Sequence, residues 1–495
     1  MSEEKWLLTL VVFLPTAGAL GIALFVRDAG RVRRFAAGVT VADLALATWV
    51  FLLYAREPGG FQLAVPYGWI PLLNAHYYLG VDGLSAPLVL LTGLLGMCAA
   101  FGSWNIQTRV REYFVWLLLL QTAVMGVFTA LDFLLFFLFW EMELMPMYFL
   151  ISVWGTGRKE YSAMKFLIFT ILGSAFMLVA LLAVYFSTGT LDMVDLGQRD
   201  LTNLKLPAQL VYALFFLAFA IKLPVWPLHT WLPDAHTDAP TAVSVMLAGV
   251  LIKMGGYGMI RVLATMFPEV TAQYAGALAV LAVVSVLYGA VVTVRQTDLK
   301  RMIAYSSVSH MGYVVLGISS LGAAAGGANA LGLNGAAMQM FAHGTITGLL
   351  FLLVGQVYDK AHTRHIPHLG GLASRMPFTA TVFLVAGLAS LGLPSLAGFV
   401  AEVMVFLGTF PVWGWPTILA VVGIVLTAGY MLWAIQRVLF GPALERFAHV
   451  KDASLVEAVP MVALLLVIVL VGVYPAPLAD VFNAGAEQVV LRFGP

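Results

Sequence analysis

The stretch Phe219–His236, FAIKLPVWPLHTWLPDAH, decides how this chain folds. It continues the apolar run LVYALFFLAFA (210–220), which is long enough to enter a bilayer. Lys222 comes next, followed by Pro224 and Pro227, and a proline inside a helix breaks it because it has no backbone donor. A lysine and a broken helix are both costly at membrane depth. The sequence therefore predicts an interrupted membrane helix built around a functional lysine.

The composition of the whole chain predicts an all-α integral membrane protein. Of its 495 residues, 61% are hydrophobic and only 10% are charged, whereas soluble domains carry about 25% charged residues. Apolar runs of about 20 residues recur, and each can cross a hydrocarbon core of about 30 Å as a helix. The short alternating segments of a membrane β-barrel do not occur. The formal net charge of +1 argues against a nucleic-acid-binding surface.

The sequence predicts no cofactor or metal site in this chain. Cys98 is the only cysteine, and one thiol cannot form an internal disulfide or hold an iron–sulfur cluster. No Gly-rich dinucleotide fingerprint follows a strand. His362, His365 and His368 have spacings that could hold a metal, but their loop is basic and lacks acidic or thiol ligands. We interpret this loop as solvated.

Hydropathy predicts about fourteen membrane spans. Their limits are 6–26, 35–55, 79–101, 113–130, 132–154, 164–187, 208–233, 240–263, 270–294, 302–320, 331–357, 377–409, 414–437 and 455–475.

The charges between the spans predict the orientation of the chain. Basic residues concentrate in loops that all follow odd-numbered spans, so these loops share the cytoplasmic side. They are 27–34, 108–112, 157–165, 295–301, 359–375 and 436–452. The connection 188–207 follows span six and carries Asp192, Asp195 and Asp200, as an outer loop can. Both termini are therefore expected on the outer side, with the chain in the plasma membrane of a bacterial cell.

Two broken spans predict an internal repeat. Span seven is broken by Pro224 and Pro227. Span twelve is broken in SLGLPSLAGF (390–399) by Gly392, Pro394 and Gly398, and Pro394 lies 170 residues after Pro224. Paired discontinuous helices in two halves are typical of transporters with inverted repeats. We expect an N-terminal three-helix segment, two five-helix repeats inverted with respect to each other, and a C-terminal helix with its tail. The expected limits are 1–112, 113–263, 270–437 and 438–495.

Six ionisable residues lie deep inside predicted spans. A charge at the centre of a span costs at least about 2.5–3.5 kcal/mol, whereas a polar contact between membrane helices returns only about 0.6 kcal/mol. Helix bridging alone therefore does not explain them, although a neutral histidine can be a satisfied core residue. The six candidates for proton translocation are Glu141, Lys222, Lys253, His310, His343 and Glu402.

The first of these candidates is expected to pair with the opening lysine. A broken helix exposes backbone polar groups that water can reach, and a carboxylate such as Glu141 beside Lys222 would poise the lysine between its charged and neutral forms. Glu143 lies two residues from Glu141 and should point away from it on a helix. Asp82 opens a span, and helix capping explains it as well as function does.

Five motifs resemble one family closely. WEMELMPMYFLISVWG (140–155), KLPVWPLHTWLPDAHTDAPTAVSVMLAGVLIKMGGYG (222–258), YSSVSHMGY (305–313), FAHGTITGLLFLLVGQVYDKAHTR (341–364) and GLPSLAGFVAE (392–402) are similar to the M-type antiporter-like subunits of NADH:quinone oxidoreductase, or complex I. The resemblance covers most of spans three to thirteen. It implies fourteen helices, two inverted repeats and assembly into a membrane arm beside L-type and N-type neighbours. It also implies that redox chemistry, with FMN, iron–sulfur clusters and quinone, occurs in partner subunits.

The resemblance also implies a role for each candidate. Glu141 matches the glutamate of span five, Lys222 the lysine of broken span seven, and Lys253 the connecting lysine of span eight. His310 and His343 match histidines of a central hydrophilic axis, and Glu402 matches the terminal glutamate of broken span twelve.

Related families leave alternatives open. Mrp sodium/proton antiporters share the pattern, but they and the L-type and N-type subunits typically carry lysine where this chain has Glu402. The second glutamate of WEMEL resembles cyanobacterial and plastid relatives that take electrons from ferredoxin, whereas DAPTAVSV (238–245) resembles respiratory subunits. The electron donor stays open between these two. A small-solute transporter that holds an anion on Lys222 is disfavoured because the buried charges spread over many spans.

Overall fold

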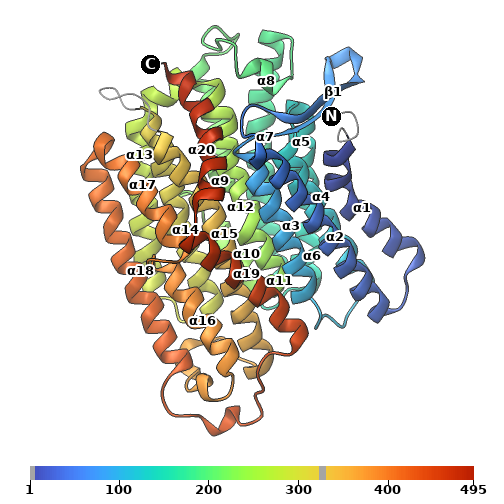
Figure 1. The fold of residues 1–495 in the computed structure, drawn as a ribbon, viewed down its shortest axis with the longest axis vertical. Helices are drawn as coiled ribbons and strands as arrows, with labels where there is room; N and C mark the ends of the chain where they lie inside the picture. The colour runs from blue at the N-terminus through green and yellow to red at the C-terminus, as the bar shows by residue number, and fades with distance from the viewer. Residues whose placement is uncertain (1–5, 323–329, 495) are drawn as a thin grey trace.

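Long helices lie side by side and form most of the molecule (Figure 1). The computed structural model describes residues 6–322 and 330–494. Within these residues, eleven helical segments are long and apolar enough to cross a membrane. They are α1 (Leu7–Phe25), α2 (Ala29–Arg56), α3 (Ser85–Gly102), α4 (Val110–Thr129), α5–α6 (Phe133–Trp154), α7 (Lys159–Thr188), the segment Thr241–Ala264, α13 (Pro268–Val294), α15 (Ala330–Ala361), α18 (Trp415–Leu439) and α19 (Leu455–Val473).

The other three predicted spans are formed by shorter or more polar helices. Span seven consists of α9 (Ala208–Lys222) and α10 (Trp231–Asp238), and span twelve of α16 (Pro377–Ser390) and α17 (Ala397–Trp413). Span ten is α14 (Leu299–Ser319), which is rich in serine. Each predicted span therefore corresponds to a helix or a helix pair. The predicted all-α membrane fold and its two broken spans are confirmed.

Span five contains a third break, which the sequence analysis did not predict. It divides at Glu143 into α5 (Phe133–Met142) and α6 (Leu144–Trp154). Pro146 has no N–H to donate to the carbonyl of Met142, so the helix loses a hydrogen bond at this point.

Span eight also departs from a regular α-helix. Two π-helical segments, Leu247–Leu251 (η3) and Met259–Ala264 (η4), flank α12 (Ile252–Gly258), and α11 (Thr241–Met246) precedes them. Widened turns of this kind occur often at functional sites. Here they flank the helix that carries Lys253.

The structure adds elements outside the spans that the sequence analysis missed. Strands β1 (Gln62–Ile70) and β2 (Ala75–Val81) form an antiparallel hairpin with two register shifts, and these irregularities obscure the alternation that marks a strand in sequence. Helix α20 (Ala476–Val490) packs over the starts of α15 and α3, where Asn334 donates to the carbonyl of Ala479 (3.1 Å). The remaining short elements are η2 (Pro71–Leu73), α8 (Met193–Leu196), η5 (Ser320–Gly322), η6 (Ile366–His368), η7 (Leu372–Ser374), η8 (Glu445–Phe447) and η9 (Leu491–Phe493).

Contacts between loops agree with the predicted alternation of sides. The basic loops meet at one end of the helices. Three hydrogen bonds illustrate this: Arg33 to the carbonyl of Ile106 (2.7 Å), Trp154 to the carbonyl of Thr108 (2.7 Å), and Arg364 to Asp298 (2.6 Å).

The hairpin, the acidic connection and the ends of the described chain meet at the opposite end. Thr9, near the start of α1, lies 2.8 Å from the hydroxyl of Tyr77 in the hairpin. Arg492, after α20, donates to the carbonyl of Arg199 (3.5 Å). Residues 1–5 and 495 lie outside the described residues. The described chain starts with α1 and finishes after α20 at this same end of the helices (Figure 1).

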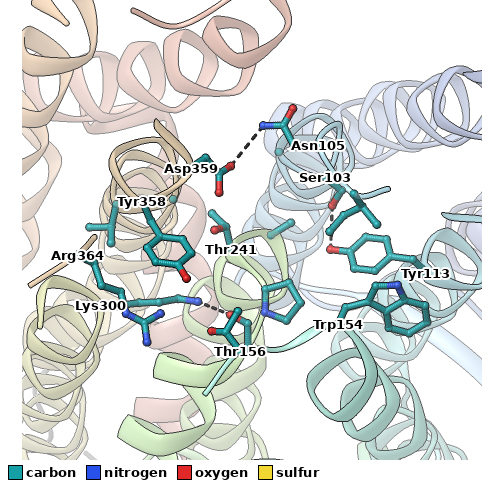
Figure 2. A pocket seen from close by; sticks show the side chains of 17 residues that line it. Ser103, Asn105, Tyr113, Trp154, Thr156, Thr241, Lys300, Tyr358, Asp359 and Arg364 are labelled. Carbon is teal, nitrogen blue, oxygen red and sulfur yellow. Dashed lines mark hydrogen bonds between the residues drawn. The ribbon is translucent and has the colours of Figure 1, made fainter. Parts of the chain in front are cut away.

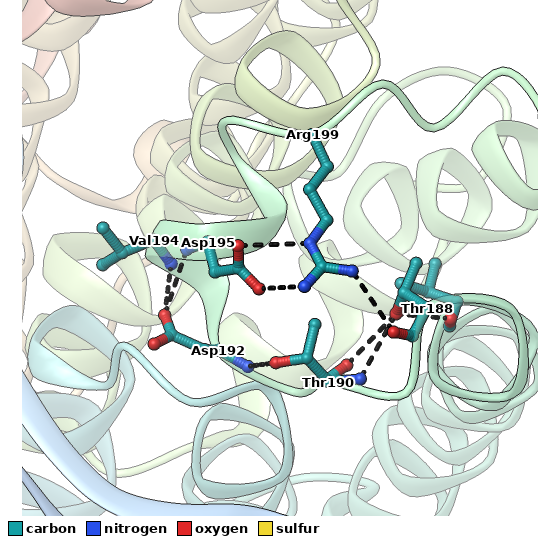
Figure 3. A network of polar contacts seen from close by, with 7 residues as sticks. Thr188, Thr190, Asp192, Val194, Asp195 and Arg199 are labelled. Atoms are coloured by element: carbon teal, nitrogen blue, oxygen red, sulfur yellow. Dashed lines mark hydrogen bonds and ion pairs between the residues drawn. The ribbon is translucent and has the colours of Figure 1, made fainter.

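The acidic connection after α7 is folded rather than merely solvated (Figure 3). Asp192 caps α8 by accepting hydrogen bonds from the backbone of Val194 (2.8 Å) and Asp195 (3.1 Å). Asp195 also pairs with Arg199 (2.8 Å), whose guanidinium reaches the carbonyl of Thr188 (3.2 Å). These contacts use the predicted outer-loop aspartates to hold the connection against the end of α7.

Candidate functional site

Lys222 is the last residue of α9 and is 1% exposed. Its ammonium forms an ion pair with the carboxylate of Glu143, which is fully buried. It also lies 5.5 Å from the ring centroid of Trp140 and 5.6 Å from that of Phe166, positions in which aromatic faces attract a cation. Because α9 ends at this residue, the lysine lies directly before the break in span seven.

The expected direct pair between Glu141 and Lys222 is wrong in this structure, where Glu143 makes the contact. Glu143 faces the end of α9, and the two glutamates are two residues apart, a spacing that points their side chains in different directions on a helix. Glu141 is only partly buried and lies in α5 beside exposed Met142. Its Oε1 has no hydrogen-bond partner among the described residues. It remains within electrostatic range of Lys222.

We expect Glu141 and Glu143 both to compensate the positive charge of Lys222. Glu143→Gln and Glu141→Gln should each retain part of the coupled turnover, because the other carboxylate remains in range. The double variant should lose nearly all of it, because a buried ammonium without a counter-charge costs about 3–5 kcal/mol. Proton uptake and quinone reduction in vesicles, on complexes checked for assembly, measure this. A double variant no worse than Glu143→Gln would remove Glu141 from the site.

Lys253 lies in α12 at the centre of the molecule and is fully buried. Its ammonium donates to the carbonyl of Ala248 and lies 2.7 Å from Nδ1 of His343. Ala248 belongs to η3, one of the two π-helical segments that flank α12. This segment thus supplies one partner of the buried lysine.

His343 connects this lysine to two further candidates. The ring centroids of His343 and His310 are 5.5 Å apart, and Nδ1 of His310 lies 3.7 Å from Oε1 of Glu402. A cavity of about 10 Å³ lies among these three side chains and Gln339, which is close to the space that one water molecule needs. The structure therefore brings Lys253, His343, His310 and Glu402 into one group.

Two glycines allow close contacts beside the charged residues of the broken spans. Gly392 has a φ of +81°, and a Cβ there would collide with the Glu402 carboxylate. Gly255 lets α12 approach the end of α9, because a Cβ there would lie 2.6 Å from the backbone nitrogen of Leu223. The helix of Lys253 thereby packs directly against the helix end that carries Lys222.

The sequence analysis missed several charged contacts that join the helices. Asp234 pairs with Lys165 (2.7 Å) and Arg301 (3.2 Å), which links α7, α10 and α14 at the end of the basic loops. Asp82 does cap α3, as expected, but it also pairs with buried Arg261 (2.5 Å). In the sequence, these residues are recognisable only as charges near the ends of apolar runs. Most charges at such positions are exposed to solvent, so the pattern does not predict an ion pair.

Two of the three histidines in the loop after α15 lie close together. His365 and His368 have ring centroids 4.6 Å apart. However, residues 6–322 and 330–494 contain no group of three or more His, Cys, Asp or Glu side chains placed to hold a metal ion. The interpretation of this segment as a loop agrees with its backbone, which has only the single turn η6.

Relatives of known name match the chain along nearly its whole length. NADH-quinone oxidoreductase subunit M of Rhodobacter capsulatus is 40% identical, over 98% of this chain and 97% of the relative. NAD(P)H-quinone oxidoreductase chain 4 1 of Synechococcus elongatus is 44% identical, over 97% of this chain and 91% of the relative. The first relative is named as an NADH-quinone oxidoreductase subunit and the second as an NAD(P)H-quinone oxidoreductase chain.

A solved structure and a family match agree with these relatives. A chain of respiratory complex I from Thermus thermophilus with bound NADH is 31% identical and superposes with a TM-score of 0.90, over 99% of this chain and 100% of that chain. Residues 130–427 match the family described as NADH:quinone oxidoreductase/Mrp antiporter, TM, and this range includes all six predicted site residues. The chain therefore belongs to the NADH:quinone oxidoreductase/Mrp antiporter family of membrane proteins.

Proposed function

We propose that this chain is the proton-translocating membrane-arm subunit of a redox-driven NADH:quinone oxidoreductase. The observation that carries the proposal is two sets of buried ionisable side chains on helices that pack together: the Lys222–Glu143 ion pair, and the group of Lys253, His343, His310 and Glu402. Whole-length similarity to subunit M and to a complex I chain supports the same assignment. The matched family includes both kinds of protein, but the names of the whole-length relatives do not favour the Mrp antiporter alternative.

The assembly is expected to supply what this chain lacks. FMN, iron–sulfur clusters and quinone would bind to partner subunits, and antiporter-like subunits of the L and N types would be its neighbours in the membrane arm. The chain is a multi-pass membrane protein. We place it in the plasma membrane of a bacterial cell with its basic loops in the cytoplasm, following the positive-inside rule. Both chain ends would then face outward.

The division of the chain follows from the same proposal. Residues 113–263 would form the first five-helix repeat and 270–437 the second, preceded by the three-helix segment 1–112 and followed by 438–495. The breaks between α9 and α10 and between α16 and α17 support this division, because each repeat then contains one discontinuous helix.

Proton transfer within the site follows from the contacts. Separation of Glu143 from Lys222 would leave a buried ammonium without its counter-charge, which favours release of its proton into the break. Lys253 can pass a proton from Nζ to Nδ1 of neutral His343 at 2.7 Å, which leaves a neutral amine and an imidazolium. The imidazolium then passes a proton from Nε2 through the small cavity to His310 or to ionised Glu402. Each step moves one proton. His343 is left with its proton on Nδ1, so it must return to the Nε2–H tautomer before it can accept the next proton from Lys253.

The composition of the purified assembly tests the proposed function. We expect flavin and iron–sulfur absorbance to copurify with this chain, because electron transfer in partner subunits must drive the translocation. Vesicles that contain the assembly should take up or release protons when NADH or another electron donor is oxidised by quinone. An intact assembly without these chromophores, which exchanges sodium for protons, would instead identify an Mrp-type antiporter.

A further inference from the structure

The two ends of span eight differ in how much space lies beside them. At the start of α11, at the end of the basic loops, a cavity of about 160 Å³ is lined by Thr241, Ala242 and Lys300 among others (Figure 2). This is many times the space that one water molecule needs. At the opposite end, in η4, the side chain of Arg261 is only 4% exposed. The first end therefore has room for water, whereas a buried guanidinium fills the second.

Contacts from three parts of the chain hold Arg261 in place. Its guanidinium pairs with the carboxylate of Asp82 (2.5 Å), which directly follows β2 and is buried. Its Nε donates to the hydroxyl of Tyr257 (3.1 Å) in α12. The guanidinium also lies 5.0 Å from the ring centroid of Phe61, just before β1, and 5.2 Å from that of Tyr257. An acidic and three aromatic or polar contacts thus fix the charge between α3, the hairpin and span eight.

Asp82 is itself fixed, and protein covers it on the outer side. Its Oδ1 accepts hydrogen bonds from the backbone of Leu84 (3.1 Å) and Ser85 (3.0 Å), while Oδ2 contacts Arg261. The next residue, Gly83, packs against α20, because a Cβ there would collide with the carbonyl of Val481. The hairpin and α20 lie at this end of the molecule (Figure 1). The ion pair is therefore enclosed by protein and does not face open solvent.

Arg261 lies between the outer end of the molecule and Lys253. Lys253 and Tyr257 both belong to α12 and are four residues apart, so they share one face of the helix. Arg261 comes four residues later and contacts Tyr257 directly. Eight residues correspond to about 12 Å along a helix at 1.5 Å per residue. Water that entered beside Arg261 would therefore meet Tyr257 next and then Lys253.

A guanidinium at this point cannot pass protons along a chain of hydrogen bonds. Each member of such a chain must accept one proton and donate another, whereas arginine has no acceptor and keeps its proton at any relevant pH. Its positive charge also repels an approaching hydronium, as arginine does in pores that exclude protons. The hydroxyl of Tyr257 is engaged as well, because it accepts from Arg261 and donates to the carbonyl of Phe128 (3.4 Å). These properties suit a barrier rather than a relay.

We propose that Arg261, positioned by Asp82 and Tyr257, is a barrier that keeps protons on the outer side from returning to Lys253 along span eight. The inference rests on the proposed function, because a proton that returned by this route would cancel one that had been pumped. The barrier takes no part in electron transfer. It acts on the number of protons retained for each electron transferred.

The passive proton leak in the absence of an electron donor tests the barrier. Vesicles that contain the assembled Arg261→Gln complex are given a pH gradient, and the decay of the gradient is followed. The glutamine amide can still donate to Asp82, but it is shorter and uncharged, which leaves room for water beside Tyr257. We expect the gradient to decay severalfold faster than with the unsubstituted complex, and fewer protons to be retained per electron. An assembled variant with the unsubstituted decay rate would overturn the proposal.

A double variant separates a barrier from an ion pair that only stabilises the fold. Removing one partner of a buried pair destabilises the protein because it leaves the other charge unpaired. Arg261→Gln combined with Asp82→Asn leaves neither charge, and asparagine can still cap α3. We expect this complex to assemble as stably as the unsubstituted one and still to leak. A double variant that is both stable and as tight as the unsubstituted complex would show a purely structural pair and refute the barrier.

Adding Lys253→Met to Arg261→Gln tests the route of the leak. If Arg261 protects Lys253, methionine should slow the decay of the gradient back toward the unsubstituted rate, because the returning proton meets no base there. A leak that persists undiminished would contradict the assignment of Lys253 as the protected group.

Arg199→Gln is the matched control. Arg199 also forms an ion pair, with Asp195 (2.8 Å), at the same end of the molecule, but it is exposed. This variant should leak no more than the unsubstituted complex, and an equal leak from it would remove the special role of Arg261. The pumping loss expected for Lys222 variants is measured with an electron donor and does not depend on the leak. The barrier and the proposed function therefore fail separately.

Discussion

Lys222→Ala is expected to leave the complex assembled and to reduce proton pumping and coupled quinone reduction by at least about tenfold, which corresponds to about 1.4 kcal/mol. The physical reason is that this ammonium is the charge that the Glu143 contact balances at the mouth of the helix break. Alanine removes both the charge and the proton that it carries. The small side chain leaves the backbone of α9 able to end where it does, because Pro224 and not Lys222 prevents the helix from continuing.

Two companion variants make this result specific. Lys222→Arg should not restore pumping, because a guanidinium keeps its proton at any relevant pH. Lys205→Ala, at an exposed lysine of the outer connection, should pump like the unsubstituted complex. The measurement is protons moved per electron in vesicles. An assembled Lys222→Ala complex with an undiminished ratio would exclude Lys222 from translocation.

Lys253→Met should have an effect of similar size, because Lys253 lies on the helix that packs against the end of α9 and contacts His343 directly. Methionine fills the space of the side chain but cannot donate to His343, which lies 2.7 Å from the ammonium. The loss should therefore appear in pumping and coupled turnover, while assembly and the uncoupled reduction of a soluble electron acceptor should be retained.

A double-variant cycle tests whether Lys253 and His343 act as one unit. If a proton passes directly between them, either single substitution already breaks the path. Adding His343→Gln to Lys253→Met should then cost much less than the sum of the two single effects. Single effects that simply add in log rate would show that the proton takes separate routes through the two residues.

The linear sequence was sufficient to predict the membrane spans and the breaks in spans seven and twelve. Apolar runs of membrane length indicate spans wherever they occur, because hydrocarbon admits only backbone that satisfies its own hydrogen bonds. Pro224 and Pro394 predict broken helices for an equally local reason, since a proline cannot donate within a helix. Charges inside spans are costly enough to mark candidate residues one at a time. These are properties of single segments, so they can be read without knowing which segments meet.

Only the tertiary structure decided which of these residues touch. Glu143 rather than Glu141 pairs with Lys222, because the fully buried Glu143 is the one whose side chain faces the end of α9. Lys253 donates to the carbonyl of Ala248, which lies in a π-helical segment that the sequence did not predict. The cavity beside Lys300 is formed by helix ends far apart in the chain. Pairings, widened turns and cavities depend on how helices pack against one another, and local propensity contains no information about that packing.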